Sequence, residues 1–407
     1  MTVHPPRQVT LLLCERSGTL LGTLPPFDVE VPWWQEVRDV VVAARMAYGV
    51  EVTVLRLLTA ADGWGVAGGP VTYLAEVAAV PADLELSPWD GADPVTEQPF
   101  RIPYARPGGP AADLAWADAT LAVAGRRRVG EAEQVRTWNL SSIWRLPVAD
   151  GLVWLKVVPP FFAHEGPMLR LLDPAVVPPL VAAEGRRVLL DDVPGEDHWG
   201  AELPVLERIV AMLVGLQVSW VGRVGELEAL GAPDWRAERF VAASDRVVAT
   251  TASELEPEVV SRLRALVDGL PARFADIASC GIPDTLVHGD FHPGNTRGSA
   301  DPDGRSVLLD WGDCGIGNPL LDQAATLTSI REEQRGPLSA YWARLWCEAV
   351  PGCEPERAAT LLGPVRALRQ AMVYRSFLAA IESDEHVYHA GDPALWLRRA
   401  AAADDDR

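Results

Sequence analysis

Clustered apolar residues divide the first 80 residues into short strand-like runs around one helix. A stretch with helical period follows Pro32 and ends at Gly49, a residue that suits a helix C-terminus. The strand-like runs lie at residues 8–14, 19–24, 50–58 and 70–80. A polar turn between the first two predicts a hairpin, and a Gly-rich loop at 62–70 precedes the last. The pattern therefore predicts a small α/β domain over residues 1–80.

Residues 81–111 are rich in Pro, Gly and Asp, the composition of a linker or of an ordered irregular connection. A second block follows, with predicted helices at 112–124 and 164–172 and predicted strands at 134–139, 142–148, 152–158 and 186–193. From residue 203 the period is helical, apart from two short apolar runs around a loop within 285–312. This order predicts an α+β fold of two lobes, the first with its hinge in 112–195 and a helical second in 196–407.

Composition narrows the class of protein. The chain has 407 residues, a hydrophobic fraction of 48% and a formal net charge of -20. The negative charge argues against nucleic acid or an anionic membrane surface as the main partner. It tolerates a cationic small substrate, although an acidic surface also simply keeps a protein soluble.

The lack of a targeting signal in the sequence and the spacing of its cysteines bear on the cellular compartment. No apolar run reaches the roughly 20 residues of a membrane span, and the first residues lack a basic leader joined to a long apolar stretch. The five cysteines show no CxxC spacing, which is typical of reduced thiols. We therefore expect a cytoplasmic protein. Its oligomeric state stays open.

The loop LVHGDFHPGNTRG, residues 286–298, carries the strongest chemical signal. Asp290 and Asn295 lie five residues apart, and Asp310 follows the next apolar run. Two carboxylates and an amide oxygen on adjacent loops suit Mg²⁺, which prefers oxygen ligands, together with a base for a hydroxyl nucleophile. Taken singly, each residue is better explained as a turn residue or the cap of a strand. The joint spacing favours the catalytic interpretation.

The segments HGDFHPGN and LLDWGDCGIGNPLLDQA resemble the signature of the aminoglycoside phosphotransferase family, whose relatives include choline kinase and protein kinases. The resemblance covers about residues 110–390 and implies a bilobal protein kinase-like fold, Mg²⁺, and ATP or GTP as phosphoryl donor. It implies that Asp290 is the catalytic base and that Asn295 and Asp310 bind Mg²⁺. We expect His288 and His292 to hold the loop rather than to contact substrate.

Lys156 is the only lysine in the chain. In the family that the signature resembles, a strand lysine contacts the α- and β-phosphates and is held by a helix glutamate, which implies these roles for Lys156 and Glu165. The compact ammonium of lysine fits between phosphate oxygens where the guanidinium of arginine would not. The alternative is a chance lysine on an exposed strand.

The resemblance also implies a phosphate-covering turn and a hinge. The turn NLSS lacks glycine, so its main-chain amides and the hydroxyls of Ser141 and Ser142 would contact phosphates, although a plain hairpin turn is equally compatible. The strand before the hinge ends at Asp191, Asp192 and Val193, whose main-chain groups would bind the purine.

Residues 1–80 faintly resemble a Nudix hydrolase. The glutamates that such enzymes place before the helix-ending glycine are missing, because Ala43, Met46 and Ala47 stand there. We expect a non-catalytic domain, and an unrelated α/β domain is nearly as compatible with the pattern.

The sequence thus predicts a small-molecule O-phosphotransferase with a hydroxyl acceptor, for which an aminoglycoside or another amine-bearing alcohol is favoured and antibiotic resistance is a candidate role. Carboxylates near Tyr341, Trp342, Trp346 and Tyr388 would suit an ammonium-bearing acceptor, unless they lie on solvated helix faces. The alternative function is a nucleotide-binding pseudokinase that acts as a regulator or scaffold.

Overall fold

The computed structural model describes residues 4–60, 67–301 and 304–404, which form two compact units. Unit 1 comprises the chain up to Ala163 together with Leu180–Asp192 and Leu378–Ala390. Unit 2 comprises His164–Pro179, Val193–Phe377 and the chain from Gly391 onward. Residues 62–66 of the predicted Gly-rich loop lie outside the described residues. The domain boundaries predicted at residues 80 and 111 stay predictions.

The first sheet of unit 1 is mixed, with the order β2-β1-β5-β4 and β3 beside β1. The predicted hairpin is confirmed, because β1 and β2 pair antiparallel, whereas β1 and β5 run parallel. The strands are β1 (Arg7–Glu15), β2 (Leu20–Thr23), β3 (Phe27–Val29), β4 (Val52–Ala60) and β5 (Gly69–Val77).

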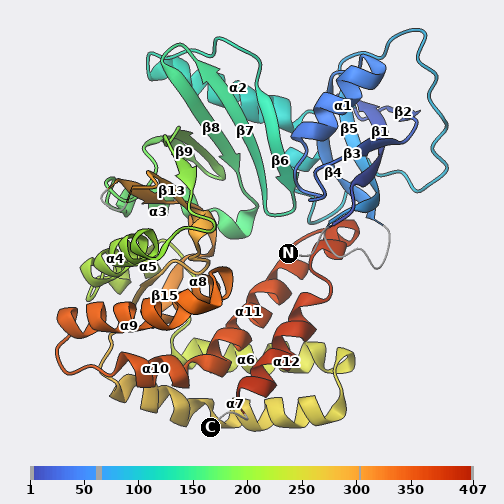
Figure 1. Cartoon of the computed structure of the whole chain (residues 1–407). Helices are drawn as coiled ribbons and strands as arrows, with labels where there is room; N and C mark the ends of the chain where they lie inside the picture. Colours follow the sequence, from blue (N-terminus) through green and yellow to red (C-terminus); the bar gives the residue numbers. More distant parts are fainter. Residues whose placement is uncertain (1–3, 61–66, 302–303, 405–407) are drawn as a thin grey trace. The chain divides into compact units, whose positions relative to one another are not determined.

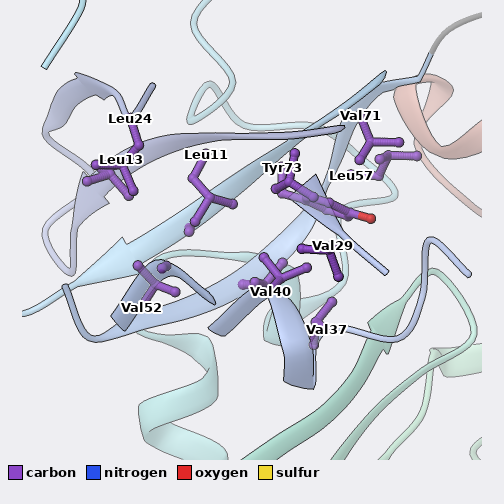
Figure 2. Packing of buried hydrophobic residues seen from close by; sticks show 14 of the residues in the cluster. Leu11, Leu13, Leu24, Val29, Val37, Val40, Val52, Leu57, Val71 and Tyr73 are labelled. Carbon is purple, nitrogen blue, oxygen red and sulfur yellow. The ribbon is translucent and has the colours of Figure 1, made fainter. Parts of the chain in front are cut away.

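Helix α1 (Arg38–Tyr48) covers one face of this sheet. Its Val40 points toward Leu11 and Tyr73 of the sheet, and all three side chains are fully buried (Figure 2). The helix ends at Gly49 as predicted, where φ is 66° and the N–H donates to the Arg45 carbonyl. Burying this apolar face stabilises the domain by roughly 25 cal/mol per Å² removed from water.

Helix α1 begins six positions after Pro32 rather than directly after it. The intervening segment pairs with β6 (Glu133–Trp138): the Val37 N–H donates to the Val135 carbonyl at 3.1 Å, and the Thr137 N–H donates to the Gln35 carbonyl at 3.0 Å. These main-chain bonds hold the segment in a turn beside β6, with the Glu36 N–H donating to the Trp33 carbonyl at 3.1 Å, a long-range effect that helical period alone does not reveal.

The second sheet of unit 1 is antiparallel, with the order β6-β7-β8-β10-β9. Figure 1 labels its strands β6, β7, β8 and β9. Its further strands are β7 (Ser141–Val148), β8 (Gly151–Val157), β9 (Leu180–Glu184) and β10 (Arg187–Asp191), of which β9 was not predicted. Helix α2 (Gly109–Val123) packs Ala117 and Leu121 against this sheet.

Residues 81–105 form an ordered connection along the first sheet rather than a loose tether. Ser87 pairs with Thr23, Trp89 packs against buried leucines on the sheet face opposite α1, and the short helix η1 (Pro103–Ala105) leads into α2.

Unit 2 is mainly helical. Its helices are α3 (Glu165–Leu171), α4 (Leu203–Ser219), α5 (Val224–Ala229), α6 (Ala237–Thr251), α7 (Pro257–Ser279), α8 (Gln323–Ser329), α9 (Glu332–Ala349), α10 (Pro355–Leu361), α11 (Gly363–Leu378) and α12 (Asp392–Asp404). Its strands are β11 (Glu196–Asp197), β12 (Thr285–Val287), β13 (Thr296–Gly298), β14 (Ser306–Leu308) and β15 (Gly315–Gly317). Within the described ranges, no helix has the length and apolarity to cross a membrane.

The chain returns to unit 1 after α11. Residues 378–390, which include the short helix η7 (Ser383–Tyr388), belong to unit 1, although the sequence predicted this region as part of the helical lobe. Tyr388 accordingly lies in the core of the first sheet, with its ring 5.9 Å from that of Trp34.

Candidate active site

Two short antiparallel strand pairs bring the predicted catalytic loops together in unit 2. Strand β12 pairs with β15 and leads into the loop that contains Asp290, whereas β13 pairs with β14 and connects Asn295 to Asp310. The Leu309 N–H donates to the Asn295 carbonyl at 2.8 Å. The predicted base and the two predicted metal ligands therefore occupy neighbouring loops.

Asn295 fixes Asp290. Its amide nitrogen donates to the Asp290 main-chain oxygen at 2.9 Å and to Oδ2 at 3.0 Å. Since both bonds use the amide nitrogen, the amide oxygen points away from Asp290 and is the atom able to ligate a metal ion. The Asp290 side chain is 40% exposed, so its carboxylate remains accessible to a substrate hydroxyl.

The two loop histidines hold the loop, as expected. His288 is fully buried, and its Nε2–H donates to the Leu309 carbonyl at 2.9 Å. Burial lowers the pKa of His288, which keeps the ring neutral. Nδ1 of His292 accepts the Gly294 N–H at 3.1 Å, and its Nε2 lies 3.5 Å from Oδ2 of Asp290.

Behind the loop, two buried charged side chains bind main-chain groups. The Asp322 carboxylate accepts the N–H groups of His288 at 2.8 Å and Gly289 at 2.7 Å, and burial raises the pKa of this carboxyl. Arg369 donates to the carbonyls of Gly289 at 2.9 Å and Asp313 at 3.2 Å. Position 289 requires glycine, because φ is 90° and an added Cβ would lie 2.0 Å from the Asp313 oxygen.

Asp310 has an unusual backbone. Among the described residues it is the only non-glycine residue with positive φ, at 58°. The next residue, Trp311, is fully buried and donates its N–H to Oε1 of Glu165 at 3.2 Å. A left-handed aspartate is uncommon, and backbone conformations of this kind cluster at active sites.

Lys156 and Glu165 fall in different units. Lys156 lies in β8, in register with Ile143 of β7 and Val188 of β10, and is half-buried. Glu165 begins α3 and is buried in unit 2. The ion pair between them stays a prediction.

The predicted phosphate turn is a two-residue hairpin loop between β6 and β7. Both serines are buried, and their hydroxyl oxygens accept indole N–H groups: Ser141 from Trp138 at 3.2 Å and Ser142 from Trp144 at 3.0 Å. Each hydroxyl retains its own hydrogen as a donor, so the phosphate role of these serines stays a prediction.

The predicted hinge follows β10. The Asp192 N–H donates to the Leu152 carbonyl at 3.1 Å, and the Val193 carbonyl accepts Nε of Arg297 at 2.7 Å. The Asp191 carboxylate accepts a hydrogen bond from Arg126. Purine binding would therefore depend on the other main-chain groups of residues 190–193.

The donor set fits magnesium. Mg²⁺ uses few protein ligands and keeps water and phosphate oxygens, so one carboxylate from Asp310 and one amide oxygen from Asn295 suffice. In the ranges that the structure describes, no group of three or more His, Cys, Asp or Glu side chains could hold a metal ion.

One aromatic residue beside the loop escaped sequence reasoning. The Trp199 ring stacks on His292 with centroids 5.0 Å apart and an interplanar angle of 28°, and it is 54% exposed. A Cβ at Gly294 would lie 2.2 Å from Nε1 of Trp199, so glycine permits this close contact. The neighbouring His198 N–H donates to the Pro293 carbonyl at 3.1 Å.

The prediction that aromatic residues beside carboxylates would contact an ammonium-bearing acceptor is wrong for three of the four aromatic residues. Trp342 and Trp346 are fully buried on the inner side of α9, and Tyr388 lies in the core of unit 1. The glutamates of α9, such as Glu332 and Glu348, are exposed, so they lie on a solvated helix face.

Comparison with known proteins identifies the family. The model of the phosphotransferase enzyme family matches residues 155–359, just over half of the chain. No curated protein sequence matches. A macrolide 2'-phosphotransferase type I has a similar structure, with a TM-score of 0.52, 18% identity, and coverage of 70% of this chain and 97% of that one. The structure of the GDP and kanamycin complex of APH(2")-IIIa is also similar, with a TM-score of 0.50, 13% identity, and coverage of 72% of this chain and 99% of that one.

These likenesses confirm the predicted α+β, protein kinase-like fold. The Nudix resemblance of residues 1–80 received no support. The matched region begins beside Lys156 and includes the loops of Asp290, Asn295 and Asp310. The chain belongs to the phosphotransferase enzyme family.

Proposed function

We propose that the protein transfers the γ-phosphoryl group of a Mg²⁺-bound nucleotide to a hydroxyl group of a small molecule. The observation that carries this proposal is the arrangement of Asp290, Asn295 and Asp310 on two loops joined by main-chain hydrogen bonds. Family membership supports the reaction class.

Asp290 acts as the base. Its carboxylate orients the acceptor hydroxyl and takes its proton as the new O–P bond forms and the bond from the γ-phosphorus to the nucleoside diphosphate breaks. Asn295 holds the carboxylate in place, which matters because phosphoryl transfer depends mainly on positioning and electrostatics. Bound Mg²⁺, held by Asn295 and Asp310, would offset the negative charge of the phosphates. Lys156 would contact the α- and β-phosphates.

The donor is ATP or GTP. A GDP complex of a structurally similar enzyme supports a nucleotide at this site. The position of Lys156 in β8, between two neighbouring strands, suits a residue that must be held at a fixed distance from phosphate oxygens.

For the acceptor we propose an amine-bearing alcohol, such as an aminoglycoside. Support comes from the net charge of -20 and from the kanamycin bound to one structural relative. Beside Asp290, the exposed ring of Trp199 offers an aromatic face to a sugar ring or an ammonium group. If this holds, the protein would contribute to antibiotic resistance.

The test is phosphoryl transfer by the purified full-length protein. Mg-ATP and Mg-GTP are supplied with aminoglycosides, macrolides, choline-like alcohols and neutral sugars, and products are detected by the added phosphate mass. Transfer that requires Mg²⁺ and disappears in Asp290→Asn supports the proposal. Nucleotide binding without turnover for any acceptor would favour the pseudokinase. Neutral sugars or macrolides outcompeting every amine, with no effect of salt on acceptor KM, would overturn the acceptor class alone.

A further inference from the structure

The segment Glu382–His389, here called the strap, contacts the turn between β6 and β7. The side-chain amide nitrogen of Asn139 in that turn donates to the Glu385 carbonyl at 3.4 Å, and its Oδ1 lies 3.2 Å from Nε2 of His389. Asn139 is fully buried and His389 nearly so. Both polar ends of one turn side chain are therefore bound by a segment about 250 positions away in sequence.

The turn needs such support. Trp138 pairs with Ser141, so Asn139 and Leu140 alone form the loop. Neither has the positive φ that two-residue hairpin loops prefer, because those angles match the twist of the strands. Because the loop has neither these positive φ angles nor a glycine, contacts with other parts of the chain must help to fix its position.

Aromatic contacts extend the same interface. The Trp138 ring lies 5.6 Å from Tyr388 in an edge-on arrangement and 5.7 Å from the His389 ring. The Trp138 carbonyl accepts the Tyr104 hydroxyl at 2.8 Å. The residue that carries the Ser141 hydrogen bond is thus itself packed against the strap.

The strap begins in a buried ion cluster. Arg101 donates to the Glu382 carboxylate at 2.8 and 3.1 Å, and Nε of Arg56 in β4 lies 3.4 Å from the same carboxylate. All three side chains are buried. Such a cluster holds its members firmly, since removing one partner leaves a buried charge uncompensated. The first sheet therefore fixes the beginning of the strap, and the end of the strap contacts the turn.

We propose that the strap positions the β6–β7 turn for the nucleotide phosphates, with Asn139 and His389 as positioning residues and Glu382 as the anchor. This inference rests on the proposed function, in which the turn lies over those phosphates. The first sheet would thereby influence nucleotide binding without contributing a group that touches the nucleotide.

The experiment measures the affinity of full-length variants for Mg-ATP and Mg-GTP by calorimetry, their nucleotide KM and kcat with water as acceptor, and their Tm. We expect Asn139→Ala and His389→Ala to weaken affinity about five- to tenfold, the effect of one or two lost hydrogen bonds, with kcat nearly unchanged because Asp290 lies in unit 2. His389→Gln should restore most of the affinity, since its amide N–H can reach Asn139.

Matched controls separate positioning from folding. His386→Ala removes the same residue type from the same strap, three positions before His389, at a residue whose side chain makes no hydrogen bond to Asn139. Asp384→Asn removes a 47% exposed carboxylate 3.7 Å from Arg56, as a control for Glu382→Gln. Both controls should keep wild-type nucleotide affinity.

The outcomes are distinct. Asn139→Ala and His389→Ala proteins with a lower Tm but wild-type nucleotide affinity would overturn the inference and leave the strap a purely structural element. No rescue by His389→Gln, together with losses in His386→Ala as well, would also overturn it. Wild-type protein that neither binds nor hydrolyses nucleotide would instead overturn the proposed function, and this inference with it.

Discussion

The amide nitrogen of Asn295 lies 3.0 Å from Oδ2 of Asp290 and 2.9 Å from its main-chain oxygen, so one side chain fixes both the carboxylate and the backbone of the proposed base. The same Asn295 has its carbonyl bonded to Leu309, directly before Asp310. The loop of the proposed base and the loop of the proposed metal ligand Asp310 are thereby connected through Asn295. Substitutions of Asp290 and Asp310 should therefore affect turnover rather than folding.

Asp290→Asn should reduce phosphoryl transfer by about 10²–10⁴, the usual cost of losing a general base, while nucleotide affinity stays close to that of the wild type. The Asn side chain keeps an oxygen acceptor for Asn295, so the loop should hold. Steady-state kinetics and calorimetry with Mg-ATP and Mg-GTP test this. Wild-type turnover in the variant would contradict the assignment of the base.

Lys156→Arg should lose most activity although it preserves the charge, because the planar guanidinium is wider than an ammonium and would displace the phosphates. Circular dichroism and Tm should match the wild type, since the side chain is only half-buried. An Arg145→Lys change in β7, the reverse substitution at a partly exposed ion pair, is the control and should be silent. A fully active Lys156→Arg protein would make the lysine incidental.

Trp199→Ala should raise the acceptor KM several-fold, in keeping with about 1 kcal/mol for an aromatic contact, with little change in nucleotide KM. Trp199→Phe should recover part of the loss because a ring can still stack on His292. If nucleotide KM rises instead of acceptor KM, Trp199 contacts the donor and the assignment is wrong.

Glu385 predicts a pH dependence of stability. Burial raises the pKa of its carboxyl to about 8, far above the usual value for glutamate. The folded state therefore binds one more proton than the unfolded state between about pH 4.5 and 8. Stability from this group is present at acid pH and falls as pH rises, by up to about 1.4 kcal/mol per pH unit. Urea unfolding of the wild type and Glu385→Gln from pH 5 to 9 tests this. Equal pH dependence in the two proteins would rule it out.

Deletion of residues 1–80 should lower both Tm and nucleotide affinity. The deletion removes Arg56 from the buried Glu382 carboxylate and Trp34 from the Tyr388 ring. Differential scanning fluorimetry and nucleotide titration of the truncated protein measure both effects. A truncated protein with wild-type affinity would show that the first sheet is a separable appendage.

The proposed site was accessible from the sequence because its parts are local. Asp290 and Asn295 lie on one loop, and Asp310 follows the next strand, so spacing alone predicted their proximity. Helix α1 and the hairpin of β1 and β2 were likewise predicted from local period and turn residues.

The residues that sequence reasoning missed act over long distances in the chain. Arg369 binds the carbonyl of Gly289, and nothing in the pattern of α11 marks that arginine as different from its neighbours. Trp342 and Trp346 were misjudged for the converse reason, because an aromatic residue near carboxylates in sequence can still face the core. The delayed start of α1 depends on pairing with β6, which no local pattern shows.

Unit 1 is assembled from three separate stretches of the chain, and the last of them, Leu378–Ala390, is synthesised only after the other two and after Val193–Phe377 of unit 2. Domains generally fold as units during synthesis, and the first sheet, with Arg56 and Tyr73 already made, must wait for Glu382 and Tyr388. Such non-local contacts slow folding. Nascent chains stalled before residue 378 should therefore stay protease-sensitive in their N-terminal part. The yield of folded recombinant protein should depend on the supply of chaperones, because the first sheet stays incomplete for most of synthesis.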